Sequence, residues 1–293
     1  MEAAKPQDFP FKPALNCSTL RPFRLDVLTQ LRLCRGAGYE GIELWMREIN
    51  AFLEAGGLLA DIRRVSQDLG IEIFDSIGFI RWADRDPAVR RAEMESARRE
   101  MQILREIGCA AMAAPPAGDT EGVTTEEYAE RFRELHQLGS EIGVEPLLEI
   151  WGHRGGIRTV RKSREILAAS GIEKGKVLID PIHLHKGGGG FGNIAELEEG
   201  SIGAVHVNDF ALAIPRGQLT DKDRRFPGDG DADLALLGDM VLQVGYRGFF
   251  SLELFIDDYG IQSAEEVLNR GMQSMYRAFS RQGERSTGWE SGN

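Results

Sequence analysis

The chain has 293 residues, 42% of them apolar and 28% charged, which is typical of a globular protein with a large core. Its formal net charge of −11 disfavours a nucleic acid or an anionic membrane surface as the main partner. Apolar runs stay shorter than the roughly 18 residues of a membrane-spanning helix, and the segment MEAAKPQDFPFKP lacks the apolar stretch of a signal peptide. Because Cys17, Cys34 and Cys109 form an odd, unpatterned set of thiols, we expect a cytoplasmic protein.

Short apolar runs recur along the chain, and seven of them follow a glycine. Glycine suits the left-handed conformation at the end of a helix, so each one indicates a helix-to-strand junction. The glycines are Gly38, Gly70, Gly108, Gly143, Gly175, Gly203 and Gly245. The runs after them cover 41–45, 71–79, 109–115, 144–151, 176–180, 204–209 and 249–255. An earlier run at 13–19 completes a set of eight predicted strands.

The segments between the runs carry helix signals. In 86–108, Asp86 is a candidate N-cap and Pro87 a candidate first helical residue. In 124–143, Thr124 and Glu127 have the spacing of a capping box, and apolar residues fall on one helical face. Both segments are therefore predicted helices.

Alternating helices and strands favour a parallel sheet, either closed into a (β/α)₈ barrel or open and doubly wound. The count of eight strands favours the α/β class with a TIM barrel. No domain boundary is evident in the sequence. We expect residues 1–283 to form one barrel domain and residues 284–293 to be a disordered tail.

Four predicted strands in the second half end in side chains that bind metals. LLEIWGH contains Glu149, KVLIDPIHLH contains Asp180, AVHVNDF contains His206 and FFSLELF contains Glu253. The intervals are 31, 26 and 47 residues, against an average of roughly 31 per strand–helix unit in a barrel. A polar insertion at 211–231 accounts for the long interval. Because barrel strands end at one rim, the pattern predicts a divalent-cation site there.

Glu149 and Glu253 carry most of this prediction, because a carboxylate buried in an apolar strand without a partner is costly. A single histidine at a strand end is more often only a local hydrogen-bonding residue. Three carboxylates and one imidazole leave coordination positions for substrate, which indicates a catalytic site with one divalent ion. The set suits Mn²⁺, Zn²⁺ or Co²⁺, with Mg²⁺ as a further candidate.

The residues after Asp180 are harder to interpret. His183 lies three residues on, near the predicted metal and within reach of a substrate oxygen. For His185 the sequence leaves open whether it supports the site. Gly187–Gly190 matches no phosphate-binding pattern, and a mobile loop over the site is the favoured interpretation.

Arg225 lies two residues before Pro227, so a rigid turn could direct its guanidinium to the site. A surface arginine is the default interpretation. Asn208 and Asp209 either orient a ligand or substrate, or cap the next segment. The default of a purely structural role also applies to three residues at earlier strand ends: Glu43, Trp45 and Asp75.

With these motifs the chain resembles the xylose isomerase-like TIM barrel superfamily of sugar isomerases and epimerases, and within it the inosose (2-keto-myo-inositol) isomerase type. The resemblance runs from GYEGIELW onward and is densest in LLEIWGH, LIDPIHLHKGG, HVNDF, LTDKDRRFPGDGDADL and SLELFIDDYGIQSAEEVL. These motifs are specific for the superfamily and its metal site, and less specific for a substrate. The proline after Asp180 and the long glycine run depart from the usual pattern.

The resemblance implies four ligands for the divalent metal: Glu149, Asp180, His206 and Glu253. It implies that two residues contact substrate oxygens: His183 and Arg225. Three further candidates for substrate contact are His153, Trp151 and Glu43. The expected substrate is a small sugar or cyclic polyol, as in inositol catabolism, and homo-oligomers are common among such enzymes.

Such an isomerase removes a proton beside a carbonyl and returns it after an enediolate forms. We hypothesise that Glu149 and Glu253 flank the substrate, that one removes the proton, and that the other, or His183, returns it. A dehydratase is the nearest alternative, because the same intermediate can expel a β-hydroxyl. A DNA-repair endonuclease fits five histidines and a charge of −11 poorly, and a non-catalytic metal-binding barrel fits the paired glutamates poorly.

Overall fold

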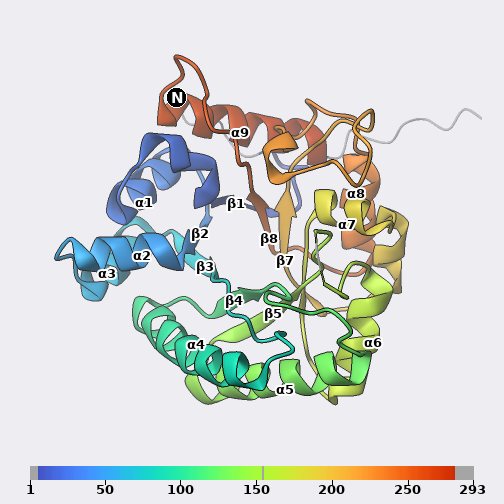
Figure 1. The fold of residues 1–293 in the computed structure, drawn as a ribbon. Helices are drawn as coiled ribbons and strands as arrows, with labels where there is room; N and C mark the ends of the chain where they lie inside the picture. Colours follow the sequence, from blue (N-terminus) through green and yellow to red (C-terminus); the bar gives the residue numbers. More distant parts are fainter. Residues whose placement is uncertain (1–5, 154, 281–293) are drawn as a thin grey trace, which may run out of the picture.

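The structure is a computed structural model that describes residues 6–153 and 155–280. Within these residues, eight parallel strands form a closed barrel in sequence order, with the helices outside it (Figure 1). The strands are β1 Lys12–Asn16, β2 Gly41–Trp45, β3 Glu72–Ile77, β4 Ala111–Ala114, β5 Glu145–Glu149, β6 Val177–Ile179, β7 Ile202–Val207 and β8 Phe249–Leu252. This confirms the closed barrel over the open sheet. The predicted tail at 284–293 lies outside the described residues.

The α-helices alternate with the strands along the chain. They are α1 Val27–Gly36, α2 Met46–Glu54, α3 Leu59–Leu69, α4 Pro87–Ile107, α5 Thr125–Ile142, α6 Val160–Ser170, α7 Pro181–Gly187, α8 Leu234–Gln243 and α9 Ala264–Phe279. Short 3₁₀ helices add η1 Cys17–Phe23, η2 Phe191–Glu196 and η3 Asp221–Asp223. Among the residues that the structure describes, no helix has both the length and the apolarity needed to cross a membrane.

The predicted helix ends are mostly correct. The side chain of Asp86 caps α4 at the amide of Ala88, and Thr124 forms a capping box with Glu127 at the start of α5. Left-handed glycines end α3, α4 and α5 at the predicted positions, Gly70, Gly108 and Gly143. Two junctions differ: α6 ends at Gly171 rather than Gly175, and Gly203 lies inside β7. A Cβ on Gly203 would lie 2.4 Å from Leu147, so this glycine makes room inside the barrel.

The barrel closes where β1 pairs with β8, from Lys12 beside Phe249 to Leu15 beside Leu252. Thr19 holds this seam just beyond the strands. Its hydroxyl donates to the carbonyl of Leu252 at 3.0 Å and accepts from the amide of Leu254 at 3.1 Å.

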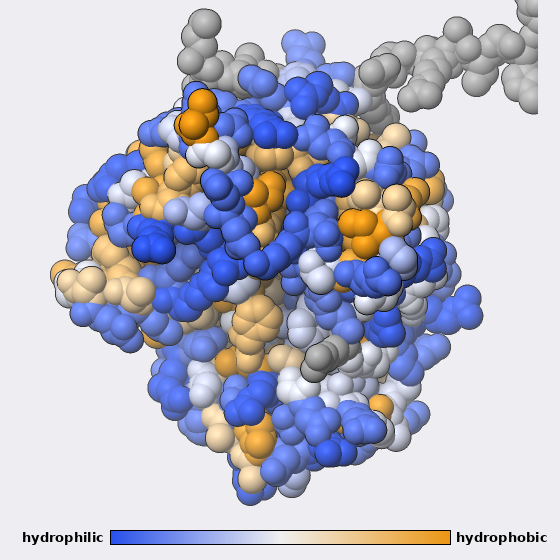
Figure 2. Space-filling view, turned by 45° about the horizontal axis from the view of Figure 1, so that its top comes forward, coloured by the Kyte–Doolittle hydropathy of each residue, from blue (hydrophilic) through white to orange (hydrophobic). Residues whose placement is uncertain are grey.

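Apolar side chains fill the lower barrel. Phe74 stacks on Phe249 with ring centroids 4.3 Å apart, and Leu147, Leu178 and Ala204 pack above them. The inward positions at the carboxyl ends of the strands are instead polar, and this is where the site forms. Large exposed hydrophobic residues lie on separate elements, and the face in Figure 2 shows hydrophobic patches within a mostly hydrophilic surface.

Candidate active site

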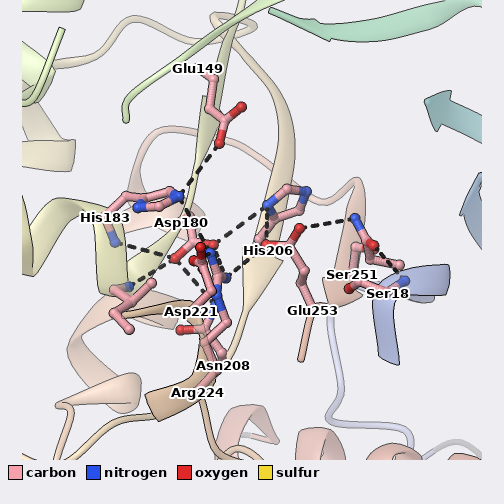
Figure 3. Close-up of polar contacts among 12 residues, drawn as sticks. Ser18, Glu149, Asp180, His183, His206, Asn208, Asp221, Arg224, Ser251 and Glu253 are labelled. Atoms are coloured by element: carbon pink, nitrogen blue, oxygen red, sulfur yellow. Dashed lines mark hydrogen bonds and ion pairs between the residues drawn. The ribbon is translucent and has the colours of Figure 1, made fainter. Parts of the chain in front are cut away.

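Three of the four predicted ligands meet at the carboxyl ends of the last strands. Asp180 directly follows β6, His206 lies in β7, and Glu253 directly follows β8. One ligand atom of each lies within 4.8 Å of the other two, and all three residues are buried (Figure 3). Nδ1 of His206 is 3.0 Å from Oε2 of Glu253 and 3.5 Å from Oδ2 of Asp180.

Glu43 holds the far side of the His206 ring. Its Oε1 lies 3.0 Å from Nε2 of His206, and its Oε2 accepts hydrogen bonds from Asn16 at 2.9 Å and Ser251 at 2.7 Å. With Nε2–H donating to Glu43, Nδ1 faces the two carboxylates, and loss of its proton would present a lone pair to a bound cation. Nδ1 is buried and has no hydrogen-bond partner among the described residues, so this donor set fits a cation.

This position corrects the expected role of Glu43. The side chain is fully buried, and both oxygens are engaged by other protein groups. It therefore orients His206, and both of its oxygens contact protein groups. Asn16 extends the same network by donating to Oε1 of Glu253 at 3.2 Å, and its own Oδ1 accepts from the indole of Trp45 at 2.7 Å.

Arg224, which the sequence interpretation missed, lies at the centre of the site. Its Nη1 contacts Oδ2 of Asp180 and is 2.7 Å from Oε2 of Glu253. Its Nη2 is 3.3 Å from Nε2 of His183 and donates to Asp221 at 2.9 Å. The guanidinium thus links the predicted metal ligands to the histidine predicted to contact substrate.

Arg225 faces the other way, against the prediction. It is exposed, and its Nη1 donates to the carbonyl of Asp229 at 3.2 Å. Its backbone forms an antiparallel bridge with Asp209, and adjacent residues of an extended segment point to opposite sides. The bridge therefore directs Arg224 inward and Arg225 outward.

Glu149 and His183 lie beside Asp180, at the ends of the adjacent strands β5 and β6. Glu149 ends β5 and lies apart from the three-residue cluster, with its Oε1 3.7 Å from Nε2 of His183 (Figure 3). His183 lies in the first turn of α7, and its buried Nδ1 has no hydrogen-bond partner among the described residues. Trp151 and His153 pack against it, with His153 and His183 centroids 4.7 Å apart. Nε2 of His153 is 3.0 Å from Oδ1 of Asp221.

The charges of the site shift its protonation equilibria in the metal-free protein. Burial raises the pKa of Glu149 to about 8 and lowers the pKa of His183 to about 3. Burial also opposes ionisation of Asp180, but Arg224, His183 and His206 together outweigh it and hold the pKa of Asp180 well below the usual value. Burial lowers the pKa of His206, yet Glu253 and Glu43 outweigh this and raise the pKa well above the usual value.

Asn208 and Asp209 divide the two roles left open for them. Nδ2 of Asn208 lies 3.2 Å from both carboxylate oxygens of Asp180 and so orients that side chain. Asp209 instead binds its own loop: it accepts from the amides of Phe210, Gly228, Gly230 and Ala232 at 2.8–3.0 Å. These bonds fix the loop that carries Arg224.

Three further groups lie outside the candidate site. His185 packs on Phe210, with centroids 4.8 Å apart. Asp75 is buried beside Glu43 in the β2–β3 register, and burial, with the Glu43 charge adding, raises the pKa of Asp75 well above the usual value. The glycine run ends α7 rather than forming a loop over the site: Gly187 packs so closely on Arg158 that a Cβ would lie 1.8 Å from its carbonyl oxygen, and left-handed Gly188 caps the helix.

A family model described as xylose isomerase-like TIM barrel matches residues 31–278. The chain belongs to this family. A relative from Bacillus velezensis named inosose isomerase is 26% identical over 250 residues, which cover 83% of this chain and 89% of the relative. A Pseudomonas aeruginosa relative named 3-dehydroshikimate dehydratase is 27% identical over 255 residues, which cover 84% of this chain but 39% of the relative. These names support an enzymatic function.

Solved structures of this family share the fold. The IolI protein with a zinc atom has a TM-score of 0.85 at 23% identity, covering 92% of this chain and 98% of that one. An L-ribulose 3-epimerase has a TM-score of 0.71 at 17% identity, covering 92% of this chain and 95% of that one.

Proposed function

We propose that this protein is a divalent-metal-dependent isomerase or epimerase of a keto sugar or cyclic keto polyol. The observation that carries the proposal is the buried cluster of Asp180, His206 and Glu253, which Arg224 links to His183 and, through His183, to Glu149. The inosose isomerase and epimerase names among its relatives and structural neighbours support the reaction class.

Four residues would hold the metal: Glu149, Asp180, His206 and Glu253. When bound, a divalent cation acts as a Lewis acid toward a carbonyl oxygen and acidifies the neighbouring C–H group. The zinc atom in the IolI crystal structure supports a divalent metal, and Mn²⁺, Zn²⁺, Co²⁺ and Mg²⁺ remain candidates.

The residues around the cluster would position the substrate. Arg224 would hold a substrate oxygen through charge-assisted hydrogen bonds, and His183 would contact a second one. Trp151 and His153 wall this side of the site through their ring contacts with His183. Together they would fix the carbonyl and its neighbouring hydroxyl between the two glutamates.

Glu149 and Glu253 would exchange the proton. They stand on different strands, at the ends of β5 and β8, so one carboxylate would remove the proton and the other would return it to the adjacent carbon. For a cyclic ketone the result is migration of the carbonyl. For an open-chain ketose the proton would instead return to the carbon that it left, on the opposite face, which inverts that hydroxyl-bearing carbon.

A dehydratase is the second candidate, favoured by the Pseudomonas aeruginosa relative. It would begin with the same proton removal by Glu149 or Glu253. The difference comes afterwards, because a β-hydroxyl would leave as water instead of a proton being returned.

The test is an NMR time course in D₂O with metal-loaded protein and a panel of inososes and ketoses. Isomerisation predicts deuterium at the carbon beside the ketone and a product of equal mass, whereas dehydration predicts loss of water. Glu253→Gln should lower the exchange rate by about 100-fold or more, while Glu265→Gln, on the exposed side of α9, serves as the matched control. An exchange rate for Glu253→Gln within a few-fold of the parent would rule out this scheme.

A further inference from the structure

The aromatic ring of Phe255 lies between two arginines. The guanidinium carbon of Arg224 is 5.2 Å from the ring centroid, and that of Arg21 is 5.5 Å from the same centroid. Arg224 belongs to the candidate site, whereas Arg21 is exposed. Phe255 also packs edge-on against Trp45, at 5.8 Å between centroids, above the apolar barrel interior. Arg21 therefore stands at the mouth, separated from the site by one ring.

A second arginine, Arg24, lies beside Arg21 because the backbone turns at the end of η1. Arg21 lies in the 3₁₀ helix η1, and Arg24 caps that helix three residues later. Arg24 has a left-handed backbone, with φ of 49° and ψ of 43°, and it is the only residue other than glycine with positive φ among those described. This turn presents both guanidiniums to one hollow.

The hollow has a volume of about 220 Å³ and is lined by Arg21, Pro22, Arg24, Phe255, Ile256 and Asp257. Its one acidic residue, Asp257, is paired with Lys222 at 2.5 Å. Within residues 6–153 and 155–280, Arg21 and Arg24 form no salt bridge, and their side chains donate no hydrogen bond. A short distance along the rim, Arg47 lies over Trp45 at 4.2 Å from the ring centroid.

A concentration of guanidiniums at the mouth contrasts with the net charge of −11 for the chain. The face of Phe255 holds the guanidinium of Arg21 and leaves its N–H groups without a hydrogen-bond partner among the described residues, whereas Arg47 lies 3.7 Å from Glu48. Guanidinium forks bind carboxylate and phosphate oxygens. Arg21 and Arg24 line one hollow beside the candidate site, a position suited to an anionic group on the molecule that reacts there.

We propose that the hollow lined by Arg21 and Arg24 is a subsite for an anionic group of the substrate, so that the substrate is a keto polyol carrying a carboxylate or a phosphate. This rests on the proposed function, because the reacting end of the same molecule must reach Asp180, His206 and Glu253. The anionic group would lie on the far side of Phe255 from Arg224.

Calorimetric titration of the full-length, metal-loaded protein with two matched pairs of compounds tests the subsite. One pair is 3-dehydroshikimate and a neutral inosose, and the other is fructose 6-phosphate and fructose. We expect the anionic member of one pair to bind at least tenfold more tightly than its neutral partner, and the responding pair identifies carboxylate or phosphate. Arg21→Gln should reduce that preference to about threefold or less. Arg64→Gln, on the exposed surface of α3, should leave it unchanged.

Equal affinities within both pairs, absence of binding by both anions, or an unchanged preference in Arg21→Gln would each overturn the subsite. The D₂O exchange measurement on the same samples separates this result from the proposed function. Exchange with a neutral inosose but no Arg21-dependent preference would leave the isomerase proposal and remove the subsite. Arg21-dependent binding without exchange would keep the subsite and remove the proposed reaction.

Discussion

The carboxylate of Glu43 lies 3.0 Å from Nε2 of His206, so that Nδ1 of the same ring faces Asp180 and Glu253. A carboxylate behind a histidine fixes the tautomer and raises the basicity of the nitrogen that binds metal. Glu43 on β2 is held in turn by Asn16 on β1 and Ser251 on β8, the next two strands on one side of it in the barrel. The orientation of His206 therefore depends on β1, β2 and β8 as well as on its own strand.

Replacing Glu43 by Gln should weaken binding of Mn²⁺ or Zn²⁺ by about 10–100-fold, because an amide in this position can donate to Nε2 and leave the proton on Nδ1. Metal titration of the chelator-treated protein measures the affinity. Ser251→Ala removes only one donor to Glu43 and should have a smaller effect. An unchanged affinity in the Glu43 variant would show that His206 does not bind the metal through Nδ1.

The neighbouring arginines provide a matched pair of variants. Arg224→Gln should lower kcat/KM by about 100-fold, because it removes the charge-assisted hydrogen bonds proposed for a substrate oxygen. Arg225→Gln changes the exposed side chain of the next residue in the same loop. Its kcat/KM should stay within about twofold of the parent. Steady-state kinetics on the substrate found by deuterium exchange makes the comparison. Equal losses in both variants would contradict the inward placement of Arg224.

Asp209 should be a stability determinant of the loop that carries Arg224. Its carboxylate accepts four backbone amide hydrogen bonds, so Asp209→Asn should lower the free energy of unfolding by about 2 kcal/mol or more. Hydrogen exchange at Gly228, Gly230 and Ala232 should accelerate. Asp231→Asn is the control, since Asp231 is exposed and accepts from a single amide, that of Leu212 at 3.0 Å. Urea denaturation gives both values.

Glu100 on α4 should make stability depend on pH away from the site. Burial, with Glu93 nearby, raises the pKa of Glu100 from 4.5 to about 7. A raised folded-state pKa gives a contribution that is fully present below pH 4.5 and is lost as pH rises through 7. In Glu100→Gln the side chain does not ionise, so the variant does not lose stability in this way as the pH rises.

The stability of Glu100→Gln relative to the parent should therefore grow by about 1–3 kcal/mol between pH 5 and pH 8. Thermal unfolding across this range measures it. Glu95→Gln, exposed on the same helix, should show a flat difference. A flat difference for Glu100→Gln as well would mean that this carboxyl is ionised at little cost.

The fold was predictable because the helix-capping signals and the spacing of the apolar runs indicated the same alternation of helices and strands. Capping signals at Asp86 and Thr124 begin real helices, and apolar runs after glycines form real strands. Gly175 and Gly203 were wrongly predicted to end helices, because glycine also occurs where a larger side chain would clash with a neighbour. In β7 the collision would be with Leu147, from a strand far away in the sequence, so no local pattern reports it.

The candidate site was predictable where a residue ends a strand, since barrel topology alone brings Asp180, His206 and Glu253 together. Residues in the irregular 211–231 segment lacked such a rule. Which of two adjacent arginines faces inward depends on the bridge between Asp209 and Arg225, a tertiary pairing without a sequence period. The sequence indicated Glu43 as a site residue, but not its hydrogen bond to His206. Its partners come from β1, β7 and β8, which are distant in the sequence.

The seam between β1 and β8 joins the two strands of the barrel that lie farthest apart in the sequence. Asn16 and Glu253 hydrogen-bond across a separation of 237 residues, and Thr19 joins Leu252 across 233. During synthesis, the edge of β1 that pairs with β8 stays unpaired until β8 has been made. Bringing the two strands together then costs the loop-closure entropy of the chain between them. A nascent chain whose β8 is still in the ribosome has neither a closed ring nor the position of Glu253. The cluster of Asp180, His206 and Glu253 therefore cannot form before β8 has been made and paired with β1 and β7.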